Sequence, residues 1–146
     1  MIAPVKLREI LNYDPLTGAI TNKKTKRLLQ ADHDGLVVVF CANTDGIKKK
    51  HKLKLDRIAY ALAFGITPRE DKRILHKNLD TSDNRLNNID LVTRTVFLLV
   101  KEAHRNLTQC IKITNHPNDQ FNYVVHWMEK NQEKQKVVHD ITAARR

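Results

Sequence analysis

One histidine, at the end of a short apolar stretch, is better placed to do chemistry than any other residue of this sequence. His76 closes residues 73–76, which are typical of a brief strand, and residues 89–92 are typical of a second one. A helix is then predicted to begin near Thr93 or Thr95, with Val96 in its buried stripe. This order points a histidine toward the start of the helix. A histidine placed so can act as a general base that deprotonates an attacking water molecule.

An ordinary buried histidine is the plainer alternative for His76, and the surrounding pattern favours a site over it. Residues 80–88 are rich in turn-forming residues. Asp80, Asp83 and Asn84 do not follow the spacing of an EF-hand calcium loop. Capping of the turn therefore explains these side chains better than calcium binding does.

The charge balance predicts an acidic partner. The chain of 146 residues holds 26 Lys and Arg against 16 Asp and Glu, which gives a formal net charge of +10. Nucleic acid is the commonest such partner, because neutralised phosphates release counterions. An anionic membrane is the rival, but the sequence holds no basic amphipathic helix with an aromatic face. The longest wholly apolar run, residues 96–100, is too short to span a bilayer.

Lysines gather in two stretches that we expect to be exposed. Residues 22–27 are a predicted basic loop. Residues 35–40 are a predicted strand with apolar residues on both faces, and Asp45-Gly46 is a tight-turn signal. Residues 47–55 return as an alternating strand with lysines on one face, which would be either merely solvated or opposed by a phosphate backbone. The candidate DNA contacts in these stretches are Lys23, Lys24, Lys26, Arg27, Lys48, Lys50, Lys52 and Lys54.

The remaining pattern predicts an α+β protein with a strand-rich N-terminal extension. We expect a first helix around Leu7, a turn over residues 13–18 and a strand that opens near Ala19. A second helix is predicted to begin at Asp56, as its N-cap, and to end at Gly65.

The C-terminal part is expected to be a separate small unit. The predicted division is a first domain over residues 1–107 and a second unit over residues 108–146. Asp140 is predicted to cap a last helix, and the sequence ends within that helix. A helix of so few residues has little apolar surface to bury, so we expect that the chain has been shortened. The three strands predicted before that helix are residues 111–114, 121–128 and 136–139.

The two cysteines argue against a cysteine-based metal module. Cys41 and Cys110 are far apart and form no C-x-x-C pair. Two lone cysteines and no signal-peptide pattern are typical of a reducing cytosol, so we expect a cytoplasmic location.

Two segments carry a resemblance to a known family. LDRIAYALAFG at residues 55–65, followed by ILHKNLDTSDNRLNNIDLVT at residues 74–93, resembles the HNH endonucleases of phages and mobile introns. LREILNYDPLTGAIT at residues 7–21 is similar to the stretch that commonly precedes such a domain. The resemblance covers roughly residues 7–106. It implies a ββα-metal domain, homing-type cleavage of double-stranded DNA, Mg²⁺ or another divalent cation, and the host cytoplasm as the location if a phage encodes the protein.

The resemblance also suggests roles for single residues. His76 takes the position of the general base, and Asn88 that of the residue heading the second strand, which helps to hold the metal or to orient the base. Asp56 stands where relatives often have histidine and is a second candidate metal ligand. Arg57 and Arg85 become further candidate DNA contacts.

Besides Asp56, two further positions depart from the family pattern. Leu75 and Phe97 stand where relatives usually have metal ligands, and neither side chain can bind a hard cation. A second hypothesis follows, in which a catalytically degenerate relative occupies DNA or blocks a host enzyme, so that a host protein is a possible partner. A third hypothesis, an RNA binder, is disfavoured because the strands lack the paired exposed aromatics that stack single-stranded bases.

The C-terminal segment has a weaker resemblance, to AP2-type DNA-binding modules. Its three strands and the helix with residues 143–145 carry that likeness. Lys112, His126 and Lys136 are candidate DNA contacts there. Trp127 is another, although burial in a core is the simpler role for a lone tryptophan.

Overall fold

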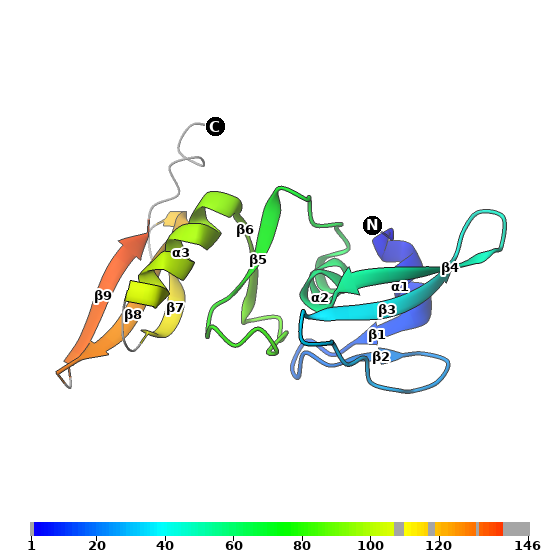
Figure 1. Cartoon of the computed structure of the whole chain (residues 1–146), viewed down its shortest axis with the longest axis horizontal. Coiled ribbons are helices and arrows are strands. Elements are labelled where there is room, and N and C mark those ends of the chain that lie inside the picture. Colours follow the sequence, from blue (N-terminus) through cyan, green and yellow to red (C-terminus); the bar gives the residue numbers. More distant parts are fainter. Residues whose placement is uncertain (1, 107–109, 117–118, 131, 139–146) are drawn as a thin grey trace. The chain divides into compact units, whose positions relative to one another are not determined.

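The computed structural model confirms an α+β fold, with helices and strands in the order α1-β1-β2-β3-β4-α2-β5-β6-α3-β7-β8-β9 (Figure 1). The structure describes residues 2–106, 110–116, 119–130 and 132–138. Within that part of the chain, no helix is both long enough and apolar enough to cross a membrane.

The chain forms two compact units, and each is built from two stretches of sequence. The first unit is Met1–Arg69 with Thr81–Ile89, and the second is Glu70–Asp80 with Asp90–Arg146. The predicted division after residue 107 stays a prediction.

The first unit begins with the short helix α1 (Pro4–Ile10), whose first position holds a proline. Leu7 is fully buried, as expected of its core-facing side. The helix ends at Ile10, because Leu11 has extended backbone and opens β1 (Leu11–Tyr13). Strand β1 pairs antiparallel with β2 (Ile20–Asn22).

The turn between β1 and β2 is confirmed. The amide of Gly18 donates to the Asp14 carbonyl at 2.8 Å, and Gly18 has a φ of +76°. One carboxylate oxygen of Asp14 accepts from the Leu16 amide at 2.9 Å. That backbone hydrogen bond is the main reason that the pKa of Asp14 lies below its usual value, and the Thr17 hydroxyl lowers it further.

A two-stranded ribbon follows, formed by β3 (Leu36–Ala42) and β4 (Lys48–Lys54). Strand β3 carries apolar residues on both faces, as predicted, but only one of the two faces is buried. Val37 and Val39 are buried, whereas Val38 is 43% exposed and Phe40 is 60% exposed. A ribbon of two strands has one face to pack on the unit's core, so alternate side chains of β3 point outward.

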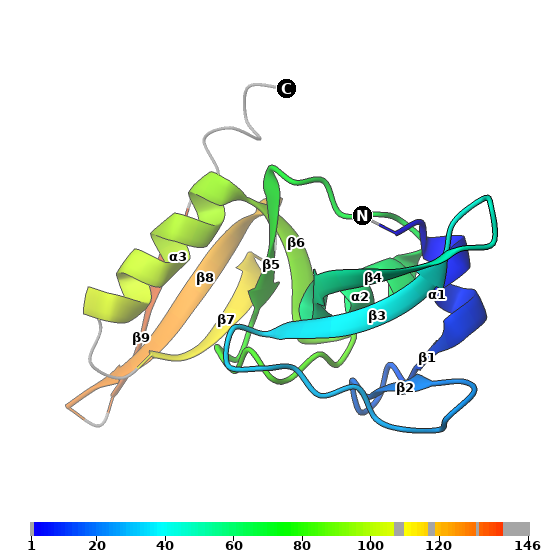
Figure 2. The ribbon, with the colours of Figure 1, turned by 45° about the vertical axis from the view of Figure 1, so that its right-hand side comes forward.

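Helix α2 (Leu55–Phe64) packs against α1 and the first strand, on the same unit as the ribbon (Figures 1 and 2). Its N-cap is Lys54 rather than the predicted Asp56, which lies in the first turn instead. The amide of Leu55 is already bound by the Gly35 carbonyl at 3.0 Å, so the chain enters the helix directly from β4. Gly65 ends the helix in the left-handed conformation, as predicted.

The second unit contains the strand, strand, helix order that the sequence predicted. Strands β5 (Lys72–His76) and β6 (Ile89–Thr93) pair with each other, and α3 (Arg94–Asn106) follows. The hydroxyl of Thr93 accepts from the Val96 amide at 3.3 Å, which caps the helix. The buried cluster of this unit is Leu75, Val92, Val96, Val100 and Tyr123.

The C-terminal strands form one antiparallel sheet in the order β7-β8-β9, as expected. They span Cys110–His116, Asp119–Glu129 and Gln132–Val138. Helix α3 contacts β8 and β9 as well as β5 (Figure 2). The helix predicted from Asp140 lies outside the described residues.

Candidate functional site

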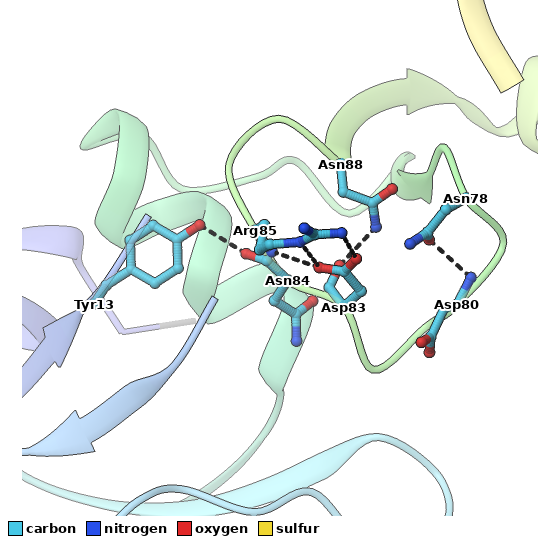
Figure 3. A network of polar contacts seen from close by, with 7 residues as sticks. All are labelled: Tyr13, Asn78, Asp80, Asp83, Asn84, Arg85 and Asn88. Carbon is cyan, nitrogen blue, oxygen red and sulfur yellow. Dashed lines mark hydrogen bonds and ion pairs between the residues drawn. The ribbon is translucent and has the colours of Figure 1, made fainter. Parts of the chain in front are cut away.

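His76, the predicted general base, is the last residue of β5 and is buried, with 5% of its surface exposed. Its carbonyl accepts from the Leu79 amide at 3.0 Å, so the chain turns sharply after the strand. The side-chain oxygen of Asn78 accepts from the Asp80 amide at 3.0 Å and closes that turn (Figure 3). The backbone of His76 is therefore held by a local turn as well as by the strand.

Asp83 and Arg85 form a tight ion pair in the loop before β6. The Arg85 guanidinium donates through Nε at 2.8 Å and through Nη2 at 2.5 Å to the two carboxylate oxygens of Asp83 (Figure 3). The Asp83 side chain is 13% exposed and that of Arg85 is 47% exposed. Asp83 raises the pKa of Arg85, so the arginine is firmly cationic. The negative charge of Asp83 is therefore balanced by Arg85, whose side chain stays partly exposed to solvent.

Asn88, the other predicted site residue, is oriented by the same loop. It is 6% exposed, and its side-chain nitrogen donates to the Asp83 carbonyl at 2.7 Å. Its backbone amide donates to the Arg85 carbonyl at 2.9 Å. Because the nitrogen end of the amide is committed to Asp83, the oxygen end faces the opposite way. The loop thus presents Asn88 in one defined orientation.

Tyr13, which the sequence predicted only as part of a turn, joins this loop from β1. Its hydroxyl donates to the Asn84 carbonyl at 2.7 Å. Burial raises the pKa of the Tyr13 phenol above its usual 10.0, and the charges of Asp14 and Asp83 raise it further. The phenol therefore keeps its proton, and with it the donated hydrogen bond, at neutral pH.

The positions where the resemblance expects metal ligands are apolar core in this structure. Leu75 is 3% exposed and lies in the buried cluster of the second unit, and Phe97 packs against that cluster. The ammonium of Lys101 lies 5.3 Å from the centre of the Phe97 ring. Asp56, the candidate ligand on α2, accepts from the Arg57 amide at 2.6 Å.

These neighbours do not fit the divalent-cation site that the resemblance implies. Hard cations such as Mg²⁺ take oxygen ligands, and Leu75 and Phe97 offer none. Among the residues that the structure describes, no group of three or more His, Cys, Asp or Glu side chains could hold a metal ion.

The predicted row of lysines on β4 is an exposed face of the ribbon. Lys48, Lys50, Lys52 and Lys54, here called the lysine face, lie opposite Ala42, Phe40, Val38 and Leu36, and all four are exposed. Lys52 Nζ lies 3.5 Å from an Asp32 carboxylate oxygen, and Lys54 Nζ donates to the Asp34 carbonyl. Four like charges on alternate residues of one strand face repel one another in the absence of an anionic partner.

The predicted basic loop is exposed on the same unit. The side-chain oxygen of Asn22 accepts from the Lys24 and Thr25 amides at 2.9 and 3.0 Å and so shapes the loop. Lys23 Nζ donates to the Arg8 carbonyl. All four candidate DNA contacts of this loop are exposed, namely Lys23, Lys24, Lys26 and Arg27.

The other candidate DNA contacts differ in what they touch. Arg57 uses its guanidinium within the protein, because Nη2 donates to the Pro68 and Arg69 carbonyls at 2.7 and 2.8 Å. Lys136 is exposed on β9. Lys112 lies on β7, but its side chain is outside the described part of the structure, as is that of Trp127.

His126 is bound within the C-terminal sheet. Its Nε2 lies 2.9 Å from the Thr114 hydroxyl and its Nδ1 lies 3.2 Å from a Glu133 carboxylate oxygen. Both ring nitrogens therefore link neighbouring strands, and a direct base contact by His126 would first have to break one of these links.

Residues 54–96 match the family model described as HNH endonuclease. Residues 54–96, here called the HNH segment, are therefore similar to that family over less than half of the chain. The HNH segment contains both predicted site residues, His76 and Asn88, together with α2, β5 and β6.

A solved structure is also similar, one described as "DNA binding and cleavage by the HNH homing endonuclease I-HmuI". The two chains are 17% identical, the match covers 92% of this chain and 74% of the other, and the TM-score is 0.48. No curated protein matches the chain.

Proposed function

We propose that this protein is a DNA-binding endonuclease of the HNH homing type, acting on double-stranded DNA. The observation that carries the proposal is the HNH segment itself, which contains His76 at the end of β5, followed by β6 and α3. In this proposal His76 is the general base.

The exposed basic residues of the first unit support DNA as the partner. The lysine face and the basic loop together offer eight exposed cationic side chains, in a chain whose formal net charge is +10. Phosphate contacts of this kind bind duplexes without reading sequence. Arg85 adds a cation beside Asn88, because the ion pair with Asp83 leaves its side chain 47% exposed.

The proposed reaction is hydrolysis of a phosphodiester bond. His76 takes a proton from water, the water oxygen bonds to phosphorus, and one ester oxygen leaves with the bonding electrons. Asn88 orients the reacting groups, and the bond from its side-chain nitrogen to the Asp83 carbonyl holds it in place. The resemblance implies a divalent cation such as Mg²⁺, but Leu75 and Phe97 could not hold one, so no step of the proposed reaction is assigned to a cation.

A second function, DNA binding without cleavage, is favoured by one observation. Leu75 and Phe97 are packed in the apolar core where relatives hold their metal. A protein of this kind would occupy DNA or block a host enzyme, so that a host protein also remains a candidate partner.

The test is nicking of supercoiled plasmid in Mg²⁺, in Mn²⁺ and in EDTA, with a gel shift on the same DNA. The variants are His76→Ala and, as a matched control, His33→Ala, whose side chain is 89% exposed. Nicking that needs a divalent cation and disappears only in His76→Ala supports the nuclease. A shift without nicking supports the second function, and neither shift nor nicking refutes DNA as the partner.

A further inference from the structure

The turn between β1 and β2 packs directly onto the loop that carries Asn88. We call residues 13–18 the brace turn and residues 83–88 the site loop. Besides the hydrogen bond from Tyr13 to the Asn84 carbonyl, the Leu86 amide donates to the Pro15 carbonyl at 3.0 Å. Two hydrogen bonds thus join stretches of chain that are about half the sequence apart, and Figure 3 shows the one from Tyr13.

The contact is closest at Gly18. A Cβ atom at this position would lie 2.6 Å from the Asn84 carbonyl carbon and 2.6 Å from the Arg85 nitrogen. Both are backbone atoms of the site loop, so they cannot swing aside as a flexible side chain does. Gly18 therefore lets two backbones touch, which a residue with a side chain would forbid.

Not every glycine of this conformation makes such a contact. Gly35 has a φ of +74°, close to the +76° of Gly18, but a Cβ there would meet only the Lys54 side chain, at 3.9 Å. The backbone conformation alone would need glycine at both positions. The contact with the site loop is what sets Gly18 apart.

These contacts continue to the predicted site residue through the loop's own hydrogen bonds. Tyr13 holds the Asn84 carbonyl, the next residue Arg85 clamps Asp83, and Asp83 accepts from the Asn88 side chain. Asn84 is 3% exposed and Asn88 is 6% exposed, so both ends of this chain of contacts are buried, while the Arg85 side chain between them is 47% exposed. A shift of the loop at Asn84 would be passed on to the Asn88 amide.

We propose that Tyr13 and Gly18 are positioning residues for Asn88, so that the N-terminal segment is part of the nuclease site. The proposal rests on the proposed function, in which Asn88 orients the reacting groups. It also means that the HNH segment, residues 54–96, is incomplete without the brace turn, because that turn lies outside it.

The experiment uses the whole chain with Tyr13→Phe, Gly18→Ala and the control Gly35→Ala. Single-turnover nicking gives the rate, and anisotropy with a labelled duplex gives the Kd. We expect Gly18→Ala to slow nicking by about 100-fold and Tyr13→Phe by about tenfold, with the Kd unchanged, since an ångström of misplacement costs on the order of 100-fold in rate. Gly35→Ala should nick at the wild-type rate.

Amide hydrogen exchange, measured by NMR, tests the same idea without catalysis. The amides of Leu86 and Asn88 are both hydrogen bonded, and we expect them to exchange faster in Gly18→Ala than in Gly35→Ala at equal Tm. If the wild type nicks, unchanged rates in both brace variants, or an equal loss in Gly35→Ala, overturn the proposal. If the wild type does not nick, the proposed catalysis has failed, and unchanged exchange at Leu86 and Asn88 overturns the positioning as well.

Discussion

Removal of the lysine face is expected to flatten the salt dependence of DNA binding. The change is the replacement of Lys48, Lys50, Lys52 and Lys54 by alanine. All four side chains are exposed on one face of β4, so the fold should tolerate their loss. If the face lies along a phosphate backbone, each lysine releases a counterion on binding.

The magnitude follows from the number of contacts. Four phosphate contacts contribute about −3.6 to the slope of log K against log salt, which is a loss of roughly 150-fold between about 50 and 200 mM salt. Lys52 is partly engaged by Asp32 at 3.5 Å. Three contacts would instead contribute about −2.7, or roughly 40-fold over the same range. The wild type should therefore lose about 40- to 150-fold more affinity than the variant over this range.

The assay is fluorescence anisotropy with a labelled duplex at a series of salt concentrations. Lys49→Ala is the matched control, because Lys49 is an exposed lysine of the same strand that lies opposite the buried Cys41, on the other face. Its slope should change little, since one contact at most is lost. Equal slopes for the wild type and the quadruple variant would refute the assignment of the lysine face to DNA.

Three further outcomes test the fold around the site. Leu7→Ala removes a fully buried side chain of α1 and should lower the free energy of unfolding by about 2–5 kcal/mol in urea melts, whereas no loss would contradict the packing of α1. The Leu16 amide lowers the pKa of Asp14, so this carboxylate stabilises the folded state at pH values above its unfolded pKa of 3.8. That stabilisation is lost as the pH falls through the lower pKa of the folded state. Asp14→Asn keeps a hydrogen-bond acceptor that does not titrate, so the free energy of unfolding of this variant should fall less steeply below about pH 4 in acid titrations. Tyr123→Phe deletes a 2.9 Å hydrogen bond to the Asp90 carboxylate and should cost about 1.5–3 kcal/mol by thermal or chemical unfolding, and a neutral effect would argue against that bond.

Local patterns in the sequence were enough to predict most elements of this fold. The alternation in residues 47–55 predicted the lysine face, because side chains of a strand alternate between its two faces. The turn-forming residues 80–88 predicted a loop between two brief strands. The apolar stripe that includes Val96 predicted α3. Each of these signals depends on residues that are neighbours along the chain.

Contacts between distant residues account for what the sequence did not show. Asp56 has the side chain of an N-cap, yet the helix begins after Lys54 because the Gly35 carbonyl binds the Leu55 amide. The role of Tyr13 was missed for the same reason, since its partner Asn84 is 71 residues away. No spacing rule links such positions.

The arginines show how a candidate site can be partly predicted. The resemblance predicts Arg57 and Arg85 as DNA contacts, and only the structure shows that each donates to groups of the protein. The Asp83–Arg85 pair lies two residues apart, so it could have been proposed from the sequence. The bond from Arg57 to the Pro68 carbonyl could not.

The distance along the chain between the brace turn and the site loop has a consequence for how the protein assembles. Joining Tyr13 to Asn84 closes a loop of 71 residues, whose entropy cost is about 4 kcal/mol. The ribbon needs only the short turn between Ala42 and Lys48 to close, so we expect it to form earlier during folding. Pulsed hydrogen exchange should then protect the ribbon amides before that of Leu86, and the reverse order would contradict this. The surface proposed to grip DNA would thus exist before the loop proposed to act on it is in place.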